Sequence, residues 1–372
     1  MLSEMLAERR IPEIPVVSPE EWGKIRAAYR EILLREEYGR PVPEPEEEWF
    51  EEKPMGYYNR AFCAESANYR EVVAHTVVNG KEFSFPFFAI YPKDTTKKYP
   101  FFVNNEFMPG LFPKCTPTEE ILDNGFAMFL LCYKDVVSDD EARDFTNGLA
   151  GVVTPPGERD ADPEATGKLC MWAWANSRVL DYALRQPYVM PESAAVIGLS
   201  RLGKTALLTG MLDERFRFVV SSGAGCSGDA LANGSTGETI RWITDKTRET
   251  RAWFCPNYYK YAEELPREFD QHMLLATIAP RTVILGAAEN DKGADPLSEF
   301  LSGYAASPAW ESHGLRGLVC PDRQPQGGDN FDQGGVCYHL RAGGHYQTRF
   351  DWHVYMETIR KKLGIPAPLL PF

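Results

Sequence analysis

Two patterns of apolar residues alternate along most of the chain. Short apolar runs of strand length recur with longer stretches in which apolar residues follow helical spacing. The strand-like runs are residues 70–78, 83–92, 99–107, 126–136, 193–200, 216–225, 281–289 and 335–344. The helical stretches are residues 169–184, 203–213, 269–278, 297–306 and 349–363. This alternation predicts an α/β fold, a three-layer α/β/α sandwich whose central sheet is mostly parallel.

The beginning of the chain departs from this pattern. Residues 20–37 have helical spacing, and residues 42–55 are rich in proline and glutamate, which we interpret as a linker with little regular structure. The turn Asn79-Gly80 between the first two strand-like runs predicts a hairpin. We therefore divide the chain into an N-terminal extension over residues 1–60 and a main domain over residues 61–372.

Composition and charge narrow the class of protein. The 372 residues are 44% hydrophobic and 25% charged, as in ordinary globular proteins, and no apolar run is long enough to span a membrane. Lys and Arg number 40 against 53 Asp and Glu. The resulting net charge of −13 argues against nucleic acid or an anionic membrane as a partner.

Cysteine usage and the first residues indicate the compartment. The eight cysteines form no CxxC pair and have no histidine at zinc-ligand spacing, so we expect free thiols and no metal site. The first residues lack the pattern of a secretory signal, so we expect a cytoplasmic protein, or a secreted one if a leader segment has been removed.

A short glycine-flanked motif carries the candidate chemistry. The segment Gly198-Leu199-Ser200-Arg201-Leu202-Gly203 follows a strand-like run and opens a helical stretch. A serine on a sharp strand-to-helix turn is the arrangement of a nucleophile elbow, in which small residues let the two backbones approach. The second glycine comes three residues after Ser200 and not two, so the spacing departs from GxSxG. The alternative interpretation is an ordinary tight turn that contains a serine.

A nucleophilic serine requires two partners. A base must take its proton, and an acid must orient that base. In a sheet of this kind the chain order is serine, acid, histidine. Glu289, Asp291 and Asp295 follow the run 281–289, and His345 follows two glycines after the last run. The remaining histidines lie outside that final loop and are interpreted as structural: His75, His272, His313, His339 and His353.

The elbow and several other segments resemble the glucuronoyl esterases, a family of carbohydrate esterases. The family's elbow reads G-[CH]-S-R-x-G-K, and this chain matches it from Gly198 to Lys204 except at Leu199. Matching segments continue in order within residues 70–352: MWAWANSRVLDYAL, SSGAG, WFCPNYYKY, FDQHMLLATIAPR, AENDKGADPLSEF and YHLRAGGHYQTRFDW. The resemblance implies an α/β-hydrolase fold, with residues 61–372 as the catalytic domain.

The resemblance also implies catalytic roles. Ser200 would be the nucleophile and His345 the general base. Arg201 would present its backbone N–H and its guanidinium to the oxyanion, because a fixed donor stabilises the charge that develops there. A second backbone donor would come from the loop after the third strand, near Asn105 and Glu106.

The acid of the triad differs within the family. Some members carry a glutamate in the turn that matches residues 221–225, where this chain has none, and others carry an aspartate that aligns with Asp291. We expect Asp291 to be the acid, with Glu289 as the alternative. Asp295 precedes Pro296 and is expected to cap a helix.

The residues around the substrate match the family less closely. By the resemblance, Lys204 would bind a hydroxyl of a uronate ring. Gly293 stands where many members have a tryptophan, and Leu199 and Tyr346 stand where fungal members have a disulfide. Three further residues are candidate substrate contacts by position only: Glu238, Glu249 and Trp253.

These features predict a serine carboxylesterase that hydrolyses esters of uronic acid carboxyl groups in fragments of plant cell-wall polysaccharide. The reaction would pass through an acyl-enzyme and require no metal or organic cofactor. The substrate would be an oligosaccharide containing a uronic acid, or a small ester. The alternatives are an acetyl xylan esterase, a pectin-type methylesterase and a carbohydrate-binding protein without catalysis.

Overall fold

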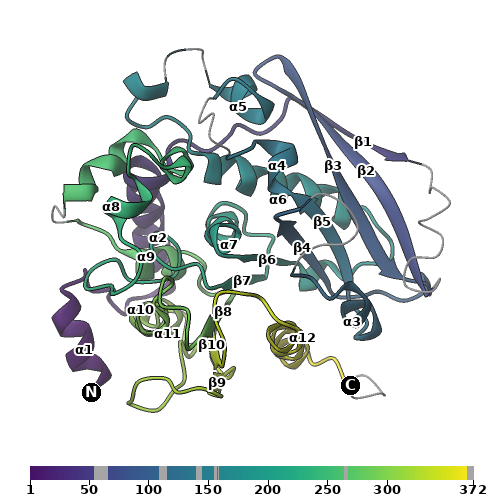
Figure 1. The fold of residues 1–372 in the computed structure, drawn as a ribbon. Coiled ribbons are helices and arrows are strands. Elements are labelled where there is room, and N and C mark those ends of the chain that lie inside the picture. Colours follow the sequence, from purple (N-terminus) through teal and green to yellow (C-terminus); the bar gives the residue numbers. More distant parts are fainter. Residues whose placement is uncertain are drawn as a thin grey trace.

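One mixed sheet forms the centre of the molecule. The computed structural model describes residues 1–53, 66–108, 115–139, 145–154, 157, 159–263 and 267–366. Within these residues, ten strands form one sheet in the order β1-β2-β3-β5-β4-β6-β7-β8-β10-β9 (Figure 1). The strands are β1 Glu47–Lys53, β2 Ala67–Val78, β3 Lys81–Pro92, β4 Phe101–Glu106, β5 Ala127–Cys132, β6 Ala195–Leu199, β7 Phe218–Ser222, β8 Thr282–Ala288, β9 Asn330–Phe331 and β10 Val336–Arg341. The successive pairs from β5 to β10 are parallel, which confirms the predicted α/β fold.

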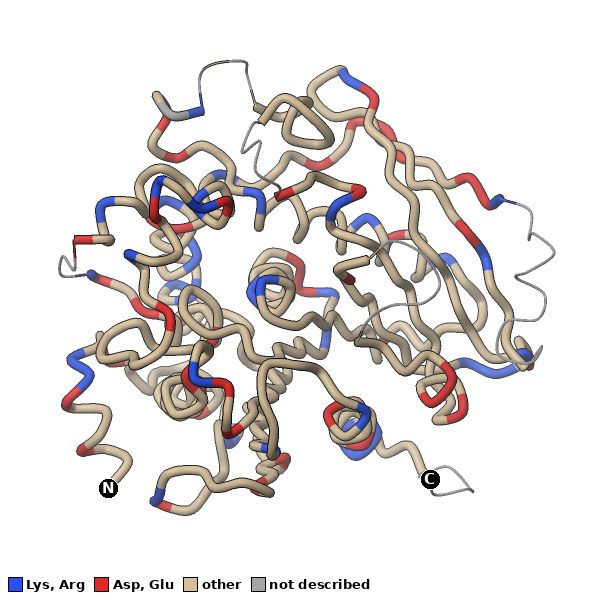
Figure 2. The backbone as a smooth tube through the Cα atoms, in the orientation of Figure 1, with Lys and Arg blue, Asp and Glu red and all other residues tan. Residues whose placement is uncertain are grey.

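Helices cover both faces of the sheet, as the sequence predicts. Helices α6 (Lys168–Leu184), α7 (Arg201–Leu212), α9 (Gln271–Ala276) and α10 (Pro296–Ala305) bury apolar residues in one core. Helices α3 (Thr118–Asp123) and α12 (Arg349–Leu363) bury theirs in a second, smaller core on the other face. The strands between these cores are apolar on both faces, and the described strands β5, β6, β7 and β8 carry no charged residue (Figure 2).

Further helical segments lie in the N-terminal region and in the connections. They are α1 Leu2–Arg9, α2 Pro19–Leu33, η1 Leu34–Tyr38, α4 Tyr133–Val136, α5 Gly148–Val153, η3 Arg159–Ala161, η4 Pro191–Ser193, α8 Ile240–Ile243, η5 Glu249–Trp253, η6 Pro256–Glu263 and α11 Pro308–Glu311. Among the described helices, none combines the length and the apolar character that crossing a bilayer requires.

The run 126–136 contains a strand followed by a helix, whereas one strand was predicted. β5 ends at Cys132 and α4 follows directly. Lys134 and Asp135 interrupt the apolar run at this point. A strand that continued through these charged residues could not be buried on both faces of the sheet. The chain therefore leaves the sheet at the edge where the parallel strands end.

The interpretation of residues 42–55 as a linker was wrong. Strand β1 lies within them and pairs antiparallel with β2, outside the predicted hairpin of β2 and β3, which is confirmed. Phe50 packs its ring against the rings of Phe87 and Tyr182. Backbone pairing and this burial outweigh the low strand preference of the acidic residues around Phe50.

The N-terminal extension packs against the rest of the molecule. Leu2, Trp22, Leu33 and Tyr38 are buried in the same core as residues of α6 and α7. The predicted boundary at residue 60 lies outside the described residues, so the division at that position stays a prediction.

Candidate functional site

Ser200 occupies a strained turn between β6 and α7. Its backbone dihedrals are φ 60° and ψ −126°, a combination that non-glycine residues rarely adopt. Its N–H donates to the carbonyl of Ser222 at the end of β7, at 2.8 Å. A Cβ atom at Gly198 would collide with the carbonyl of Leu202, so the helix can fold back this closely only over a glycine. This geometry is that of the nucleophile elbow.

Asp291 and His345 form a hydrogen-bonded pair. Asp291 follows β8 and His345 follows β10, and the carboxylate Oδ2 lies 2.6 Å from the imidazole Nδ1. The Asp291 side chain is 8% exposed and the His345 side chain is 46% exposed. With Nδ1–H directed to the carboxylate, Nε2 is the nitrogen left to take a proton from a nucleophile.

Ser200 and the acid–base pair meet at one turn. The Ser200 N–H binds Ser222, and the next residue, Gly223, touches the pair. A Cβ atom placed on Gly223 would lie 3.1 Å from Asp291 Oδ2 and 3.5 Å from His345 Nδ1. The structure thus brings the three predicted triad residues together at the edge where β6, β7, β8 and β10 end.

The other two acidic candidates lie elsewhere. Glu289 is exposed and its carboxylate lies over the backbone of Gly327, in the loop before β9. Asp295 caps α10, where its Oδ1 accepts the N–H of Ser298 at 3.1 Å. Of the three residues, Asp291 contacts His345.

Arg201 is held in a fixed orientation beside Ser200. Its Nη1 forms an ion pair with Asp139, and Tyr133 donates a hydrogen bond of 2.8 Å to the other oxygen of that carboxylate. The guanidinium carbon lies 4.7 Å from the centre of the Trp253 ring. The aromatic face of Trp253 and the carboxylate of Asp139 therefore fix the guanidinium. The Arg201 side chain as a whole is 27% exposed.

Two side-chain nitrogen atoms at the contact between Arg201 and Trp253 lack hydrogen-bond partners among the described residues. Trp253 Nε1 and Arg201 Nε are both buried and have no hydrogen-bond partner within the described part of the chain. Buried polar groups are normally paired, so these two donors are exceptions to that rule. Trp253 was a candidate substrate contact, and the structure places it against Arg201.

The segment expected to give a second oxyanion donor is part of a strand. Asn105 and Glu106 end β4 and pair with Leu131 and Cys132 of β5, whereas we expected them in a loop. Both are buried, and burial raises the pKa of Glu106. The parallel pairing with β5 extends the strand through these polar residues, and the loop begins at Phe107.

Lys204 is buried below the elbow. Its side chain is 2% exposed, and its ammonium donates to the carbonyls of Ala224 and Cys226, the latter at 2.6 Å. Both carbonyls belong to the turn after β7. The predicted contact of Lys204 with a ring hydroxyl stays a prediction.

The loop that carries Glu238 covers the segment of Asp291. The N–H of Glu238 donates to the carbonyl of Gly293 at 2.9 Å. Glu249 begins η5, the short helix that ends at Trp253. These placements put Glu238 next to the acid and Trp253 next to Arg201, while their roles toward a substrate stay predictions.

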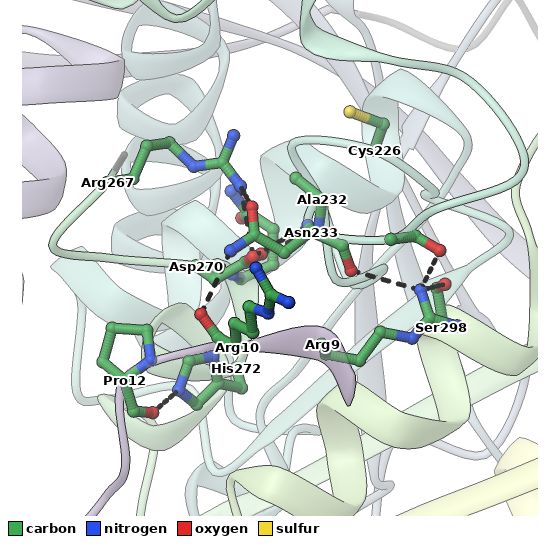
Figure 3. A network of polar contacts seen from close by, with 12 residues as sticks. Arg9, Arg10, Pro12, Cys226, Ala232, Asn233, Arg267, Asp270, His272 and Ser298 are labelled. Carbon is green, nitrogen blue, oxygen red and sulfur yellow. Dashed lines mark hydrogen bonds and ion pairs between the residues drawn. The ribbon is translucent and has the colours of Figure 1, made fainter. Parts of the chain in front are cut away.

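The N-terminal extension supports the same loop. Figure 3 shows Arg9 reaching the carbonyl of Asn233, at 3.2 Å, and the hydroxyl of Ser298, at 3.0 Å. In the same view, the buried His272 contacts the carbonyl of Pro12 at 2.8 Å, in agreement with the structural role predicted for this histidine. The beginning of the chain thus holds the loop that leads to Glu238.

Several residues near the site were not predicted from the sequence. Asp139 and Tyr133 hold Arg201, and Asp229 and Glu299 lie buried behind the turn after β7. A polar segment directly after a buried strand is the one signal for Asp139. Nothing in the local sequence distinguishes Asp229 or Glu299 from surface carboxylates.

Comparison with known sequences identifies similar proteins. A family model described as glucuronyl esterase of fungi matches residues 160–314. A carbohydrate esterase from an unknown prokaryotic organism is 32% identical over 268 residues, which are 71% of this chain and 60% of that protein. A 4-O-methyl-glucuronoyl methylesterase of Phanerochaete carnosa is 31% identical over 152 residues, 39% of this chain and 37% of that protein. The chain therefore spans 60% or less of the length of these two relatives.

Solved structures resemble the whole chain. A glucuronoyl esterase from Solibacter usitatus is 27% identical and has a TM-score of 0.80, covering 94% of this chain and 98% of that chain. A glucuronoyl esterase from Teredinibacter turnerae has a TM-score of 0.81 at 23% identity, covering 96% of this chain and 90% of that chain. The second likeness is one of fold.

Proposed function

Because this chain belongs to the glucuronoyl esterase family, we propose that it is a serine carboxylesterase that hydrolyses esters of uronic acid carboxyl groups. The observation that carries the proposal is the 2.6 Å hydrogen bond between Asp291 and His345 at the turn that also binds the Ser200 backbone. Its substrates are glucuronate esters in fragments of plant cell-wall polysaccharide, with methanol or a benzyl-type alcohol as the leaving group.

In the first half of the reaction, Ser200 Oγ attacks the ester carbonyl carbon. His345 Nε2 takes the hydroxyl proton, and the carboxylate of Asp291 stabilises the imidazolium that forms. The tetrahedral intermediate collapses when the C–O bond to the alcohol breaks. The alcohol leaves with the proton from His345, and the uronoyl group remains on Ser200 as an ester.

Arg201 stabilises the oxyanion of the tetrahedral intermediate. Its backbone N–H lies at the start of α7, and its guanidinium is fixed by Asp139 and Trp253. A donor that is already oriented need not reorganise when charge develops, and one such donor contributes about 3 kcal/mol to transition-state stabilisation.

Water completes the cycle. His345 takes a proton from a water molecule, whose oxygen attacks the acyl carbon. The bond to Ser200 Oγ then breaks, and His345 returns the proton to that oxygen. The products are the free uronic acid and the regenerated hydroxyl of Ser200.

The names of the relatives support the choice of substrate. The Phanerochaete carnosa protein is a 4-O-methyl-glucuronoyl methylesterase, and the structure from Solibacter usitatus is that of a glucuronoyl esterase. Both names place the acid side of the ester on glucuronate. Since this chain covers part of the first relative, we carry its substrate over as a proposal.

Hydrolysis of three substrates side by side tests the proposal. We expect release of methanol from methyl glucuronate to be faster than from methyl galacturonate, and acetate release from acetylated xylan to be slowest. Ser200→Ala is the control for background hydrolysis and is expected to be inactive. Faster release of acetate than of methanol would overturn the proposed substrate class, and turnover unchanged in Ser200→Ala would overturn the mechanism.

A further inference from the structure

The turn after β7 contains three residues with positive φ values, and its conformation depends on contacts with surrounding side chains. Gly223, Gly225 and Ser227 have positive φ values of 53°, 63° and 60°. Glycine adopts such values without strain, whereas a non-glycine residue such as Ser227 keeps a positive φ only where surrounding contacts determine the conformation.

Lys204 holds the carbonyl side of the turn. Its ammonium donates to Ala224 and Cys226, which flank Gly225. The side chain is 2% exposed, and a Cβ atom on Gly228 would lie 2.9 Å from Lys204 Cγ. A buried ammonium is costly unless it is paired and hydrogen bonded, so this lysine is tightly constrained by the turn.

Two buried carboxyl groups hold the amide side. The N–H of Gly225 donates to Asp229 Oδ1 at 2.8 Å and to Glu299 Oε1 at 3.1 Å. Ser221, at the end of β7, donates to the other oxygen of Asp229 at 2.6 Å. The Gly225 amide thus lies between two acidic side chains that come from different elements.

The two carboxyl groups lie close together, because both accept the N–H of Gly225. Burial raises the pKa of Glu299 well above its ordinary value, and the charge of Asp229 raises it further, so Glu299 favours its neutral form. Burial also raises the pKa of Asp229, but hydrogen bonds and the Lys204 ammonium favour its charged form. The cluster is then one ammonium, one carboxylate and one neutral acid.

The same turn lies against the acid–base pair of Asp291 and His345. Gly223 lies against Asp291 and His345, and its N–H donates to the carbonyl of Gly286 in β8 at 2.9 Å. A Cβ atom on Gly225 would lie 2.9 Å from the Cα of Ala294, in the segment that follows Asp291. The turn therefore touches the loop of the catalytic acid at two points.

We propose that Lys204, Asp229 and Glu299 are positioning residues for Asp291 and His345. Lys204 fixes the carbonyl groups of the turn, and the carboxyl groups of Asp229 and Glu299 fix the amide of Gly225. Gly223 is thereby held against Asp291 and His345 and limits them to one orientation. The proposal deepens the proposed function and rests on it. It gives Lys204 a role in every ester hydrolysis at this site, whether or not the substrate has sugar hydroxyls.

Lys204→Met tests this role with two substrates, methyl glucuronate and 4-nitrophenyl acetate, which has no sugar. We expect kcat to fall by about 10- to 100-fold on both, as for a small misplacement of catalytic groups, with KM for methyl glucuronate changed less than about twofold. The exposed lysine Lys24 provides the matched control, Lys24→Met, which is expected to behave as the unaltered protein. A rise in KM for methyl glucuronate with unchanged turnover of the acetate would overturn the proposal.

A spectroscopic measurement keeps the test independent of the substrate. The proton between His345 Nδ1 and Asp291 gives a low-field proton resonance, which we expect to shift or broaden in Lys204→Met and to stay unchanged in Lys24→Met. An unchanged resonance in folded Lys204→Met overturns the positioning role. If the unaltered protein hydrolyses neither ester, the proposed function fails, while the resonance still decides the positioning role.

A second pair of variants covers the case in which Lys204→Met does not fold. Glu299→Gln keeps an uncharged side chain whose oxygen can accept the Gly225 N–H, whereas Glu299→Ala leaves that N–H with the carboxyl group of Asp229 alone. We expect the Gln variant to retain at least about ten times the kcat of the Ala variant. Equal kcat values in two variants with native circular dichroism would contradict the role of the carboxyl pair.

Discussion

Asp291 Oδ2 lies 2.6 Å from His345 Nδ1, although 54 residues separate the two along the chain. The contact arises because β8 and β10 are parallel neighbours, so that the loops after them leave the same edge of the sheet. A hydrogen bond of this length to a carboxylate fixes both the ring orientation and the nitrogen that carries the proton.

Replacement of Asp291 by asparagine is therefore expected to cost most of the activity. The amide can present a donor to Nδ1 and so favour the wrong tautomer, which lowers kcat by about 10³- to 10⁴-fold in a triad of this kind. Methanol release from methyl glucuronate measures the effect. Glu289→Gln is the matched control, because the carboxylate of Glu289 lies over Gly327, whereas Asp291 is the carboxylate hydrogen bonded to His345. A larger loss in Glu289→Gln than in Asp291→Asn would assign the acid to Glu289.

The strained backbone of Ser200 is expected to lower the stability of the protein while it serves activity. Ser200→Gly is expected to abolish turnover and to raise the free energy of unfolding by about 1 kcal/mol, because glycine adopts positive φ without strain. Ser200→Ala is equally inactive but keeps the strain, so its stability should match that of the unaltered protein. Urea denaturation of the three proteins compares them, and equal stability of the Gly and Ala variants would argue against strain at this turn.

Asp139 is expected to act through Arg201. In Asp139→Asn the guanidinium loses its ion pair and keeps its contacts with the rings of Trp253 and Phe107, so we expect kcat to fall about tenfold with little change in KM. Tyr133→Phe removes the hydrogen bond to Asp139 and should produce a smaller loss in the same direction. Asp135→Asn, in α4, is the control for a nearby change of charge. A fall in kcat as large in Asp135→Asn would show a general effect of charge.

Glu37 predicts a dependence of stability on pH. Burial raises its pKa from an ordinary 4.5 to about 8, so the folded protein keeps a proton that the unfolded chain releases. The stability that this group contributes is present in full below pH 4.5 and is lost as the pH rises toward about 8. In Glu37→Gln the share of the decline that comes from this group should be absent, so stability should fall less with rising pH than in the unaltered protein.

Chemical denaturation at a series of pH values measures that difference. The exposed Glu31 gives the control variant Glu31→Gln, for which we expect the same pH profile as the unaltered protein. An identical decline in Glu37→Gln would show that the carboxyl group of Glu37 is already ionised in the folded protein at neutral pH.

The sequence predicts the fold and the elbow because both depend on local patterns. Strand-like runs mark β6, β8 and β10, and the order of residues along an α/β sheet then places Ser200, Asp291 and His345 at one edge. The placement of Asp295 as a helix cap follows equally from the proline after it. These inferences need no knowledge of which side chains meet across the molecule.

The supporting residues depend on distant contacts and were missed for that reason. Asp139 pairs with Arg201 from 62 residues away, and Glu299 meets the amide of Gly225 from 74 residues away. A carboxylate in a polar stretch predicts a solvated surface, and only the folded chain shows which of them are buried. Strand β1 was misjudged for the same reason, since its partner β2 supplies the stabilisation that its own sequence lacks.

Strand β1 has a consequence for any shortened form of the protein. Its seven residues pair with residues 71–77 of β2, a strand of twelve residues with valines along it. Without residues 1–60, the backbone amides and carbonyls of this part of β2 would face solvent as an open template for another chain. Self-association of such a fragment would follow from this uncovered edge, even if its catalytic residues were correctly assembled.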